Sequence, residues 1–328
     1  MFPFPFIKLA FGGVLVNISQ GDPQPQLITN EKIRTGRAAK KTRFKNKGYF
    51  LLLLPPLIVF IIGMIIPLIM GIYNSFTDWD GISLTKSWVG FANYLEIFKD
   101  EIFMKAFKFT FLFMIFNTII QNIAALLFAV ILDSSIKAKN LYRVIIFSPV
   151  LLSPILVGQI WTKMYGDILP SLNDLLGTNL NFSLFSSPDT VLSGLLIANN
   201  WQWIGYWMLI YLAGLQAIPK ELYEASTVDG GNWWQKFYHI TIPMLAPSIT
   251  ICTIGIATGS LKVFELIVAS TNGGPGDASQ SLIMYIFNSA FTSQRASYAS
   301  AMSVIFLIVL LIFAFIQLKV LRKREVEL

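Results

Sequence analysis

Six long apolar runs, separated by polar segments, make up most of this chain of 328 residues. They fall at residues 49–75, 107–132, 143–165, 190–216, 243–269 and 296–320. Each run can cross the about 30 Å hydrocarbon core of a bilayer, which takes about 20 helical residues. Backbone polar groups cannot stay unpaired in lipid, and the runs are far too long for barrel strands. The sequence therefore predicts an all-α integral membrane protein, a bundle of six transmembrane helices. Pro149 and Pro154 should kink the third helix.

Composition supports a membrane protein and excludes a disulfide-rich protein and a structural zinc protein. Apolar residues are 55% of the chain and charged residues only 13%, about half the share that is usual in soluble proteins. The chain has one cysteine, Cys252, which excludes a disulfide framework. The chain also has one histidine, His239. Together, Cys252 and His239 are too few ligands for a structural zinc site, so no metal is expected.

The net charge of +7 arises from basic residues that gather on one side of the predicted bundle. They precede the first run and follow the second, fourth and sixth runs. These residues are Lys32, Arg34, Arg37, Lys40, Lys41, Arg43, Lys45, Lys47, Lys137, Lys139, Arg143, Lys220, Lys236, Lys319, Arg322, Lys323 and Arg324. The opposite loops carry acidic residues, notably Asp78, Asp80, Asp100, Glu101, Asp167, Asp174 and Asp189. Because cytoplasmic loops carry the excess of Lys and Arg, both termini are predicted to be cytoplasmic, and no nucleic-acid partner is expected.

The apolar runs divide the chain into three parts. Residues 1–48 form an N-terminal tail, residues 49–320 a transmembrane domain and residues 321–328 a basic C-terminal tail. In the first tail, residues 1–20 are apolar but interrupted by prolines, and residues 31–47 are basic. The start lacks a basic beginning with a clean apolar core and a small-residue cleavage site, so neither a span nor a cleaved signal peptide is expected. An interfacial segment and a mis-assigned start codon are both open.

A polar insert at residues 217–243 separates the fourth and fifth runs. Its first half predicts a short helix that begins at Pro219 and carries apolar residues at helical spacing. These apolar residues are Leu222, Ala225 and Val228. Gly230 and Gly231 then break the pattern.

The second half of the insert predicts another short helix. Asn232 can cap it, and Gln235 three residues later completes a pair that is similar to a capping box. Trp233, Phe237 and Ile240 fall at positions i, i+4 and i+7, which gives one apolar face on a segment too polar to span lipid. An ordinary amphipathic connector would show the same local pattern.

The insert closely resembles the signature loop of ABC importer permeases. In that family Glu-Ala-Ala, a glycine six residues after the Glu, and a later Ile-x-x-Pro form the cytoplasmic coupling helices. The matching residues here are Glu224, Ala225, Ser226, Gly230, Ile240 and Pro243, with Asp229 directly before the glycine. Ser226 in place of the second alanine is the only departure. The resemblance implies that Glu224 makes a polar contact with an ATPase subunit, that Gly230 permits a close approach or tight turn, and that Pro243 starts the next span.

Two further segments are similar to the carbohydrate branch of this family, the maltose and glycerol-3-phosphate type permeases. The first lies after the first apolar run, at residues 75–79 and 88–94. The second is the glycine-rich segment 271–276, followed by Leu282, Tyr285, Ala290 and Phe291. The resemblance extends over residues 45–320 and implies the six-helix fold of type I importer permeases in a bacterial cell membrane.

Uphill transport needs an energy source, yet the chain contains no Gly-x-x-x-x-Gly-Lys-Ser/Thr phosphate loop. ATP and magnesium must then be used by another chain, and this one is expected to be a transporter subunit that is no enzyme and binds no cofactor. The resemblance implies four kinds of partner. They are a second permease subunit, usually forming a heterodimer, two ATP-binding subunits, an extracytoplasmic solute-binding protein, and a sugar or oligosaccharide.

Polar residues inside the apolar runs mark a candidate substrate path, because each is costly in hydrocarbon unless it faces the bundle interior or water. The fourth run places amides among aromatic rings. These residues are Asn199, Asn200, Gln202, Trp203, Tyr206 and Trp207. Sugar faces pack on aromatic rings while hydroxyl groups need amide partners, so the cluster predicts a sugar site. Helix packing through interhelical amides is the alternative.

The fifth run contains Lys262 and Glu265, three residues apart and therefore expected on neighbouring surface of one helix. Pairing, or snorkelling to the outer surface, would reduce the cost of a buried lysine, about 2.5 to 3.5 kcal/mol at a helix centre. A direct role in gating the path or contacting substrate is the other interpretation. Weaker candidates of the same kind are Asn117, Gln121, Asn122 and Gln159.

Two rival functions belong to other classes. An intramembrane enzyme would need a nucleophile with a base, an acidic dyad or metal ligands, and the runs contain no such set. An ion-coupled secondary transporter could use Lys262 and Glu265, but it would not need the coupling loop. The sequence does not name the sugar.

Overall fold

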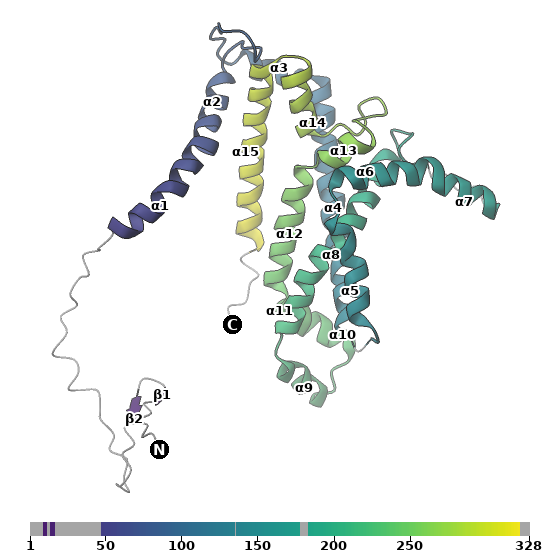
Figure 1. Ribbon diagram of the computed structural model, residues 1–328. Coiled ribbons are helices and arrows are strands. Elements are labelled where there is room, and N and C mark those ends of the chain that lie inside the picture. The colour runs from purple at the N-terminus through teal and green to yellow at the C-terminus, as the bar shows by residue number, and fades with distance from the viewer. Residues whose placement is uncertain (1–8, 12–13, 17–46, 135, 178–182, 322–328) are drawn as a thin grey trace, which may run out of the picture. The chain divides into compact units, whose positions relative to one another are not determined.

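The computed structural model describes residues 9–11, 14–16, 47–134, 136–177 and 183–321 (Figure 1). It divides into two compact units, residues 1–63 and 64–328. The first unit contains the antiparallel strands β1 (Leu9–Phe11) and β2 (Val14–Val16), with Leu9 opposite Val16, and the helix α1 (Lys47–Phe60). Apart from these strands, the features predicted for residues 1–20 and for most of 31–47 lie outside the described residues, as do residues 322–328 of the predicted basic C-terminal tail.

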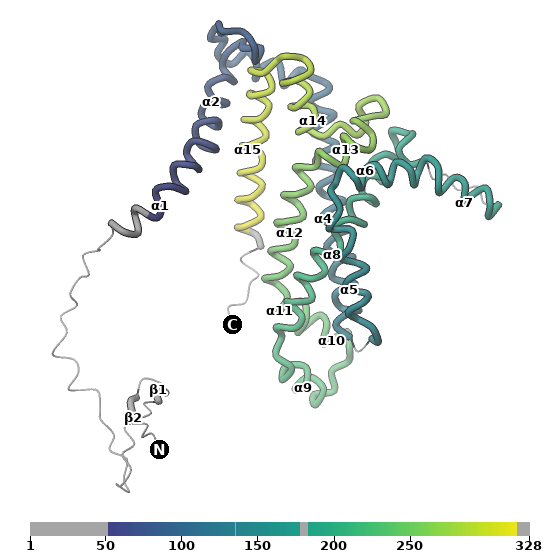
Figure 2. The backbone as a smooth tube through the Cα atoms, in the orientation of Figure 1, coloured from purple at the N-terminus to yellow at the C-terminus, as the bar shows by residue number. Residues whose placement is uncertain are grey.

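The π-helix η2 (Ile61–Ile65) leads into the second unit, where the regular structure of the described part is helical (Figure 2). The helices up to the polar insert are α2 (Ile66–Asn74), α3 (Ala92–Ile97), α4 (Glu101–Asp133), α5 (Lys139–Phe147), η3 (Ser148–Leu151), α6 (Pro154–Lys163), η4 (Met164–Ile168), α7 (Leu169–Leu176) and α8 (Val191–Ala217). The remaining helices are α9 (Lys220–Val228), α10 (Trp233–Lys236), η5 (Phe237–Thr241), α11 (Ile242–Met244), α12 (Ala246–Leu261), α13 (Glu265–Ser270), α14 (Leu282–Phe287), η6 (Asn288–Thr292) and α15 (Ala296–Leu321).

The predicted all-α membrane fold is confirmed. By length and composition, three described helices can cross a membrane, and they are Leu52–Asn74, Glu101–Asp133 and Ala296–Lys319. Two bent pairs raise the number to five if each pair is one span, and they are Lys139–Leu151 with Pro154–Leu176, and Trp233–Met244 with Ala246–Leu261. The remaining predicted span is α8, whose 27 residues are long enough to cross. With its central amides and aromatic residues, α8 is not among the helices counted above by length and composition.

The predicted kink in the third run is a full break. The helix axis bends by 100° between Lys139–Leu151 and Pro154–Leu176. Pro154 cannot continue the preceding helix, because it lacks a backbone N–H and restricts the residue before it. Ser153 instead starts a new helix, since its hydroxyl accepts a hydrogen bond from the backbone N–H of Leu156 at 3.3 Å.

The fifth run is not one helix, contrary to the prediction of a span over residues 243–269. The segment Trp233–Met244 meets Ala246–Leu261 at 66°, and α12 ends at Leu261. Lys262, Val263 and Phe264 are not helical, and α13 begins only at Glu265. The extended φ of −144° at Phe264 interrupts the helix without a glycine or proline to signal the break.

The core of the second unit forms where α4 packs along α8 and α12 (Figures 1 and 2). Small residues permit close approach, as membrane helix packing requires. Ala125 and Ala129 of α4 are fully buried together with Met208 of α8. Gly205 of α8 faces α5 so closely that an added Cβ would lie 2.3 Å from the carbonyl oxygen of Ile146. This packing places the middle of α4 directly against the polar middle of α8.

Candidate functional site

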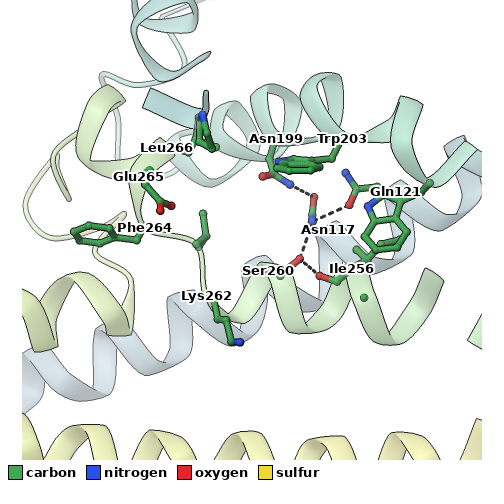
Figure 3. A pocket seen from close by; sticks show the side chains of 15 residues that line it. Asn117, Gln121, Asn199, Trp203, Ile256, Ser260, Lys262, Phe264, Glu265 and Leu266 are labelled. Carbon is green, nitrogen blue, oxygen red and sulfur yellow. Dashed lines mark hydrogen bonds between the residues drawn. The ribbon is translucent and has the colours of Figure 1, made fainter. Parts of the chain in front are cut away.

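A pocket of about 180 Å³ lies where α4, α8, α12 and the break between α12 and α13 meet (Figure 3). Each element contributes polar or aromatic side chains to it. The lining residues that the site argument uses are Asn117 and Gln121 of α4, Asn199, Trp203 and Trp207 of α8, Gly255, Gly259 and Ser260 of α12, and Lys262 and Glu265 beside the break. The broken fifth run is therefore part of the pocket wall.

Asn117 is the centre of a hydrogen-bond network that joins the three helices (Figure 3). Its Oδ1 accepts hydrogen bonds from the amide nitrogens of Asn199, at 3.1 Å, and Asn200, at 2.9 Å. Its Nδ2 donates to the hydroxyl of Ser260 at 2.7 Å and lies 3.4 Å from Oε1 of Gln121. One buried amide thus fastens α4 to both α8 and α12.

Two polar atoms of this network lack a protein partner in the described structure. They are Nε2 of Gln121 and Oδ1 of Asn200, on side chains that are 2% and 6% exposed. Buried polar groups in proteins are almost always hydrogen-bonded, to protein or to ordered water or ligand. Gln121 lines the pocket, and its amide nitrogen is a buried donor that has no protein partner in the described part of the chain.

The aromatic side of the pocket comes from α8. Trp203 and Trp207 line it, and the ring of Tyr206 lies edge-on to both, with centroid distances of 6.4 and 4.8 Å. Trp207 packs directly over Gly255, where an added Cβ would lie 2.2 Å from Cη2 of the indole. The pocket therefore offers flat apolar rings on one wall and amide and hydroxyl groups on another.

The structure brings together part of the predicted substrate path. Asn199, Trp203, Trp207, Lys262 and Glu265 line the pocket. The other three predicted residues do not. Asn200 is a buried support for Asn117, Gln202 donates to the backbone oxygen of Leu152 at 2.9 Å, and Tyr206 is exposed beside the pocket. For Asn200 and Gln202, the alternative of helix packing through interhelical hydrogen bonds describes the structure better.

The predicted arrangement of Lys262 and Glu265 is wrong. They do not share a helix surface, because Lys262 caps the end of α12 and Glu265 is the first residue of α13. They also form no ion pair, since the ion pairs of the described residues are Lys163–Asp167 and Arg295–Glu96. Figure 3 shows the Lys262 ammonium group pointing away from the Glu265 carboxylate. Both side chains are exposed in the single chain.

Sequence reasoning missed the small residues of the pocket. Gly255, Gly259 and Ser260 are not charged or aromatic and did not stand out within an apolar run. Gly255 was the one signal, because a glycine inside a membrane helix lets a neighbour approach closely, as the Trp207 ring does there. Ser260 lines the same pocket and hydrogen-bonds to Asn117.

The polar insert folds into the two predicted short helices, α9 and α10, the second continuing as η5. The capping box is present, since Asn232 Oδ1 accepts from the backbone N–H of Gln235 at 2.9 Å and Gln235 Oε1 accepts from that of Asn232 at 2.7 Å. The predicted apolar face is visible in the stacking of Trp233 on Phe237, at 5.2 Å. Pro219 is the cap before α9 and not its first helical residue, because its ψ of 131° is extended.

The turn between α9 and α10 requires both glycines. Gly230 has a φ of +75°, a conformation that favours glycine. Gly231 donates its N–H to the backbone oxygen of Ser226 at 2.7 Å, and an added Cβ there would lie 2.4 Å from the Ser226 hydroxyl. Glu224, Ala225 and Asp229 are exposed on this loop, so they are free to meet another chain.

Comparison with known proteins identifies the family. Residues 103–326 match the family described as "binding-protein-dependent transport system inner membrane component". The chain belongs to this family. It is 34% identical, over 88% of its own length and 100% of the relative's, to the probable starch degradation products transport system permease protein AmyD of Thermoanaerobacterium thermosulfurigenes. It is 31% identical, over 84% and 95%, to the multiple sugar-binding transport system permease protein MsmF of Streptococcus mutans.

A solved structure has the same fold. It is a bacterial ABC transporter involved in the import of the acidic polysaccharide alginate, which matches 85% of this chain and 96% of its own with a TM-score of 0.74 and 20% identity. The chain is thus a multi-pass membrane component of a binding-protein-dependent transport system and not a catalytic ATPase. Membership in this family sets aside the ion-coupled secondary transporter.

Proposed function

We propose that this chain is the permease subunit of an ATP-driven importer that carries a sugar or oligosaccharide across a bacterial cytoplasmic membrane. The pocket between α4, α8 and α12 is the observation that carries the substrate class. Trp203 and Trp207 offer rings on which a sugar face can pack, and Asn199 and Gln121 offer amides for hydroxyl groups. The printed names of the relatives AmyD and MsmF, which refer to starch degradation products and to multiple sugars, agree with this chemistry.

The pocket chemistry suits transient binding. A pathway must hold its substrate strongly enough to admit it and weakly enough to release it. Among the described residues, no charged side chain hydrogen-bonds to the amide network, and the unpaired amide nitrogen of Gln121 gives direction without a strong ionic bond. Lys262 and Glu265, exposed at the helix break, stand beside the pocket and are assigned here to its entrance.

The polar insert couples this chain to ATP hydrolysis by partner subunits, which bind ATP and magnesium in its place. Glu224, Ala225, Ser226, Asp229 and Gly230 form the contact surface on α9 and its turn. Ile240 and Pro243 connect that surface to α12 through η5 and α11. Two ATP-binding subunits, a second permease subunit in a heterodimer and an extracytoplasmic solute-binding protein complete the proposed assembly. The alginate transporter structure, solved with a periplasmic protein that holds an alginate pentasaccharide, supports the last partner.

The charge distribution supports a cytoplasmic insert and cytoplasmic termini. α9, α10 and the start of α5 lie at one end of the second unit, and the loop that contains α3 lies at the other (Figure 1). Lys139, Lys220 and Lys236 are at the first end, whereas Asp78 and Asp100 are at the second. This polarity follows the positive-inside rule.

The proposed function is tested by purifying the tagged chain from native membranes in mild detergent. We expect a second permease and a phosphate-loop ATPase to co-purify, and ATP hydrolysis to rise with one sugar when the matching binding protein is added. Recovery of the chain without any ATPase would contradict the proposal. So would association and uptake that survive both Glu224→Arg and Gly230→Asp.

The pocket is tested by a matched pair of aromatic variants in α8. Trp203→Ala removes a ring that lines the pocket, whereas Tyr206→Ala removes a ring that lies beside it. We expect Trp203→Ala to lower sugar uptake while the complex still assembles, and Tyr206→Ala to retain most of the uptake. Equal effects of the two changes would argue against this pocket as the path.

A further inference from the structure

An exposed apolar stripe lies on the outer loop that follows the first span. We define this α3 stripe as Trp88, Phe91, Leu95 and Phe98, which are 63%, 69%, 65% and 64% exposed. The spacing of Phe91, Leu95 and Phe98 places these three along one side of α3 and its ends. Trp88 comes before the helix, in a β-bridge with Thr77, and joins them through the Phe76 ring, which contacts both Trp88 and Phe91. Ile97, on the other side of α3, is fully buried in the core with Phe103 and Tyr298. The helix therefore has apolar residues on both sides, and only one side is covered.

Hydrogen bonds and ring contacts hold the stripe in its exposed position. Asn93 donates from Nδ2 to the backbone oxygens of Ser75, at 2.9 Å, and Thr77, at 2.8 Å. The Tyr94 hydroxyl lies 2.7 Å from that of Ser75. Behind the stripe, the Phe76 ring stacks on Trp88 and meets Phe91 edge-on, each with centroids 5.3 Å apart. A fixed apolar patch of this kind marks an interaction surface.

The hydrogen bonds of this loop place the stripe at the level where two spans end. The span Leu52–Asn74 stops one residue before Ser75, the residue to which Asn93 and Tyr94 bind. The Thr77 hydroxyl lies 2.8 Å from that of Ser297, and the Ser297 N–H donates to the backbone oxygen of Trp79 at 2.9 Å. Ser297 opens the span Ala296–Lys319, whose 24 residues are about 36 Å long at about 1.5 Å per residue. That length exceeds a hydrocarbon core of about 30 Å only slightly, so both span ends lie in the headgroup region.

Basic side chains flank the stripe. Lys86 donates to Oδ1 of Asn74 at 2.9 Å, and its ammonium group lies 4.8 Å from the centre of the Tyr73 ring. Lys99 is exposed directly after Phe98. Of the acidic residues nearby, Asp78 accepts from the N–H of Ser87, and Asp80 accepts from those of Ile82 and Ser83. Glu96 pairs with Arg295 at 2.7 Å, and Glu101 is exposed two residues after Lys99. Aromatic residues with lysines at their edge are typical of a surface that contacts lipid headgroups.

We propose that the α3 stripe is a lipid-binding surface of the outer leaflet. Its four apolar side chains lie among the headgroups and the first acyl carbons, and Lys86 and Lys99 face lipid phosphates. This contact fixes the depth of the loop to which the outer ends of α2 and α15 are attached. The proposal does not depend on the transported substrate.

The test uses single-cysteine labelling of the full-length chain, purified with its co-purifying subunits and placed in nanodiscs of phosphatidylglycerol and phosphatidylethanolamine. Leu95→Cys carries an environment-sensitive fluorophore on the stripe. Leu84→Cys, in the same loop but outside the stripe and fully exposed, is the matched control. The unchanged chain gives the labelling background, because its one cysteine, Cys252, is buried.

We expect lipids with a nitroxide on the headgroup or near the top of the acyl chain to quench the label at position 95, and to leave the label at position 84 largely unaffected. Nitroxides near the end of the acyl chain should quench position 95 less. Quenching of position 95 only by a water-soluble agent would overturn the proposal. Protection of position 95 solely after an extracytoplasmic binding protein is added would overturn it too, and would assign the stripe to a protein partner.

Discussion

At the scale of single residues, Gly255 decides where the Trp207 ring lies in the pocket. Gly255 and Gly259 are both on the pocket wall, but an added Cβ would strike the indole only at Gly255, since Gly259 has no atom within 4 Å. We expect Gly255→Ala to push Trp207 out of place and lower sugar uptake, with a loss of stability of about 1 to 3 kcal/mol that is typical of overpacking.

Gly259→Ala is the matched control for this prediction, because it adds the same methyl group to open space on the same helix. It should leave the unfolding temperature almost unchanged, and its uptake measures the effect of a methyl group on the pocket wall without displacement of Trp207. Transport assays and thermal unfolding of the two variants, purified in parallel, make the comparison. Equal loss in both would show that the helix tolerates no added methyl group and that Trp207 has no special part.

Residue types predicted the pocket only where chemistry could be recognised without geometry. The amides and tryptophans of α8 stood out because polar and aromatic side chains are unusual in an apolar run, and Asn199, Trp203 and Trp207 do line the pocket. The sequence could not predict that Asn117 is the centre of the hydrogen-bond network. Asn117 has this role because it bonds to Asn199, Asn200 and Ser260 at the same time. That reach depends on helix packing, which one sequence does not encode locally.

At the scale of elements, the turn between α9 and α10 depends on the fit between Ser226 and Gly231. A Cβ at position 231 would lie 2.4 Å from the Ser226 hydroxyl and 2.9 Å from its backbone oxygen. We expect Gly231→Ala to displace α10 and weaken co-purification of the ATPase subunits. Removing the hydroxyl in the double variant Gly231→Ala with Ser226→Ala should restore part of the association.

Ser226→Ala alone is the control for this prediction, and it should associate normally because family members carry alanine at the matching position. Quantitative pull-down of the ATPase subunits measures all three variants. A double variant no better than Gly231→Ala would mean that the backbone oxygen, and not the hydroxyl, sets the limit.

Asp100 connects the outer ends of three helices. It caps α4 through the N–H groups of Ile102 and Phe103, and it accepts hydrogen bonds from the hydroxyls of Tyr285 and Tyr298. Burial alone would raise the pKa of Asp100, but the hydrogen bonds from Tyr285, Tyr298 and the backbone outweigh it and hold the pKa below the ordinary value of 3.8. A depressed pKa means that the ionised carboxylate stabilises the folded state.

The acid stability of the protein should therefore depend on Asp100. Its contribution is complete above the ordinary pKa of 3.8 and is lost as the pH falls through the lower, folded-state value. We expect Asp100→Asn to lower the unfolding temperature at pH 7 and to reduce the further drop on acidification. Asp174→Asn, at an exposed position on α7, is the control and should leave the pH profile unchanged. Parallel profiles for wild type and Asp100→Asn would contradict this account.

Element boundaries were predictable where a local signal exists. The break at Pro154 and the capping box at Asn232 follow from backbone chemistry that is written in adjacent residues. The break after Leu261 has no such signal, because Lys262, Val263 and Phe264 all tolerate a helix. Tertiary packing decides it, since α13 lies against α6 and places Gly158 of α6 so near α13 that an added Cβ would lie 2.8 Å from Ala269.

At the scale of the whole chain, hydropathy predicts the membrane fold because only helices satisfy their backbone within one long apolar run. It does not predict which runs bend: by length and composition three described helices can cross unbroken, while two other runs are bent pairs. At the outer end of the second unit, residues far apart in the sequence are joined by the Thr77–Ser297 hydrogen bond and the Glu96–Arg295 ion pair. The pocket lies deeper, where the ties are the hydrogen bonds of Asn117.

This contrast predicts which parts of the second unit must separate during transport. The outer tie joins the loop before α3 to α15 and leaves the pocket free, whereas the Asn117–Ser260 bond of 2.7 Å closes α4 onto α12 at the pocket itself. We expect a disulfide between Thr77→Cys and Ser297→Cys to leave sugar uptake intact, because both sides of that tie move together. A disulfide between Asn117→Cys and Ser260→Cys should lower uptake below the level that the same double variant shows after reduction, a level itself reduced by the loss of the Asn117 hydrogen bonds. Sugar uptake is measured for each double variant before and after reduction, and the reduced form is the control for the disulfide-linked form. Block by the outer disulfide, or free transport with the inner one closed, would place the moving boundary elsewhere in the bundle.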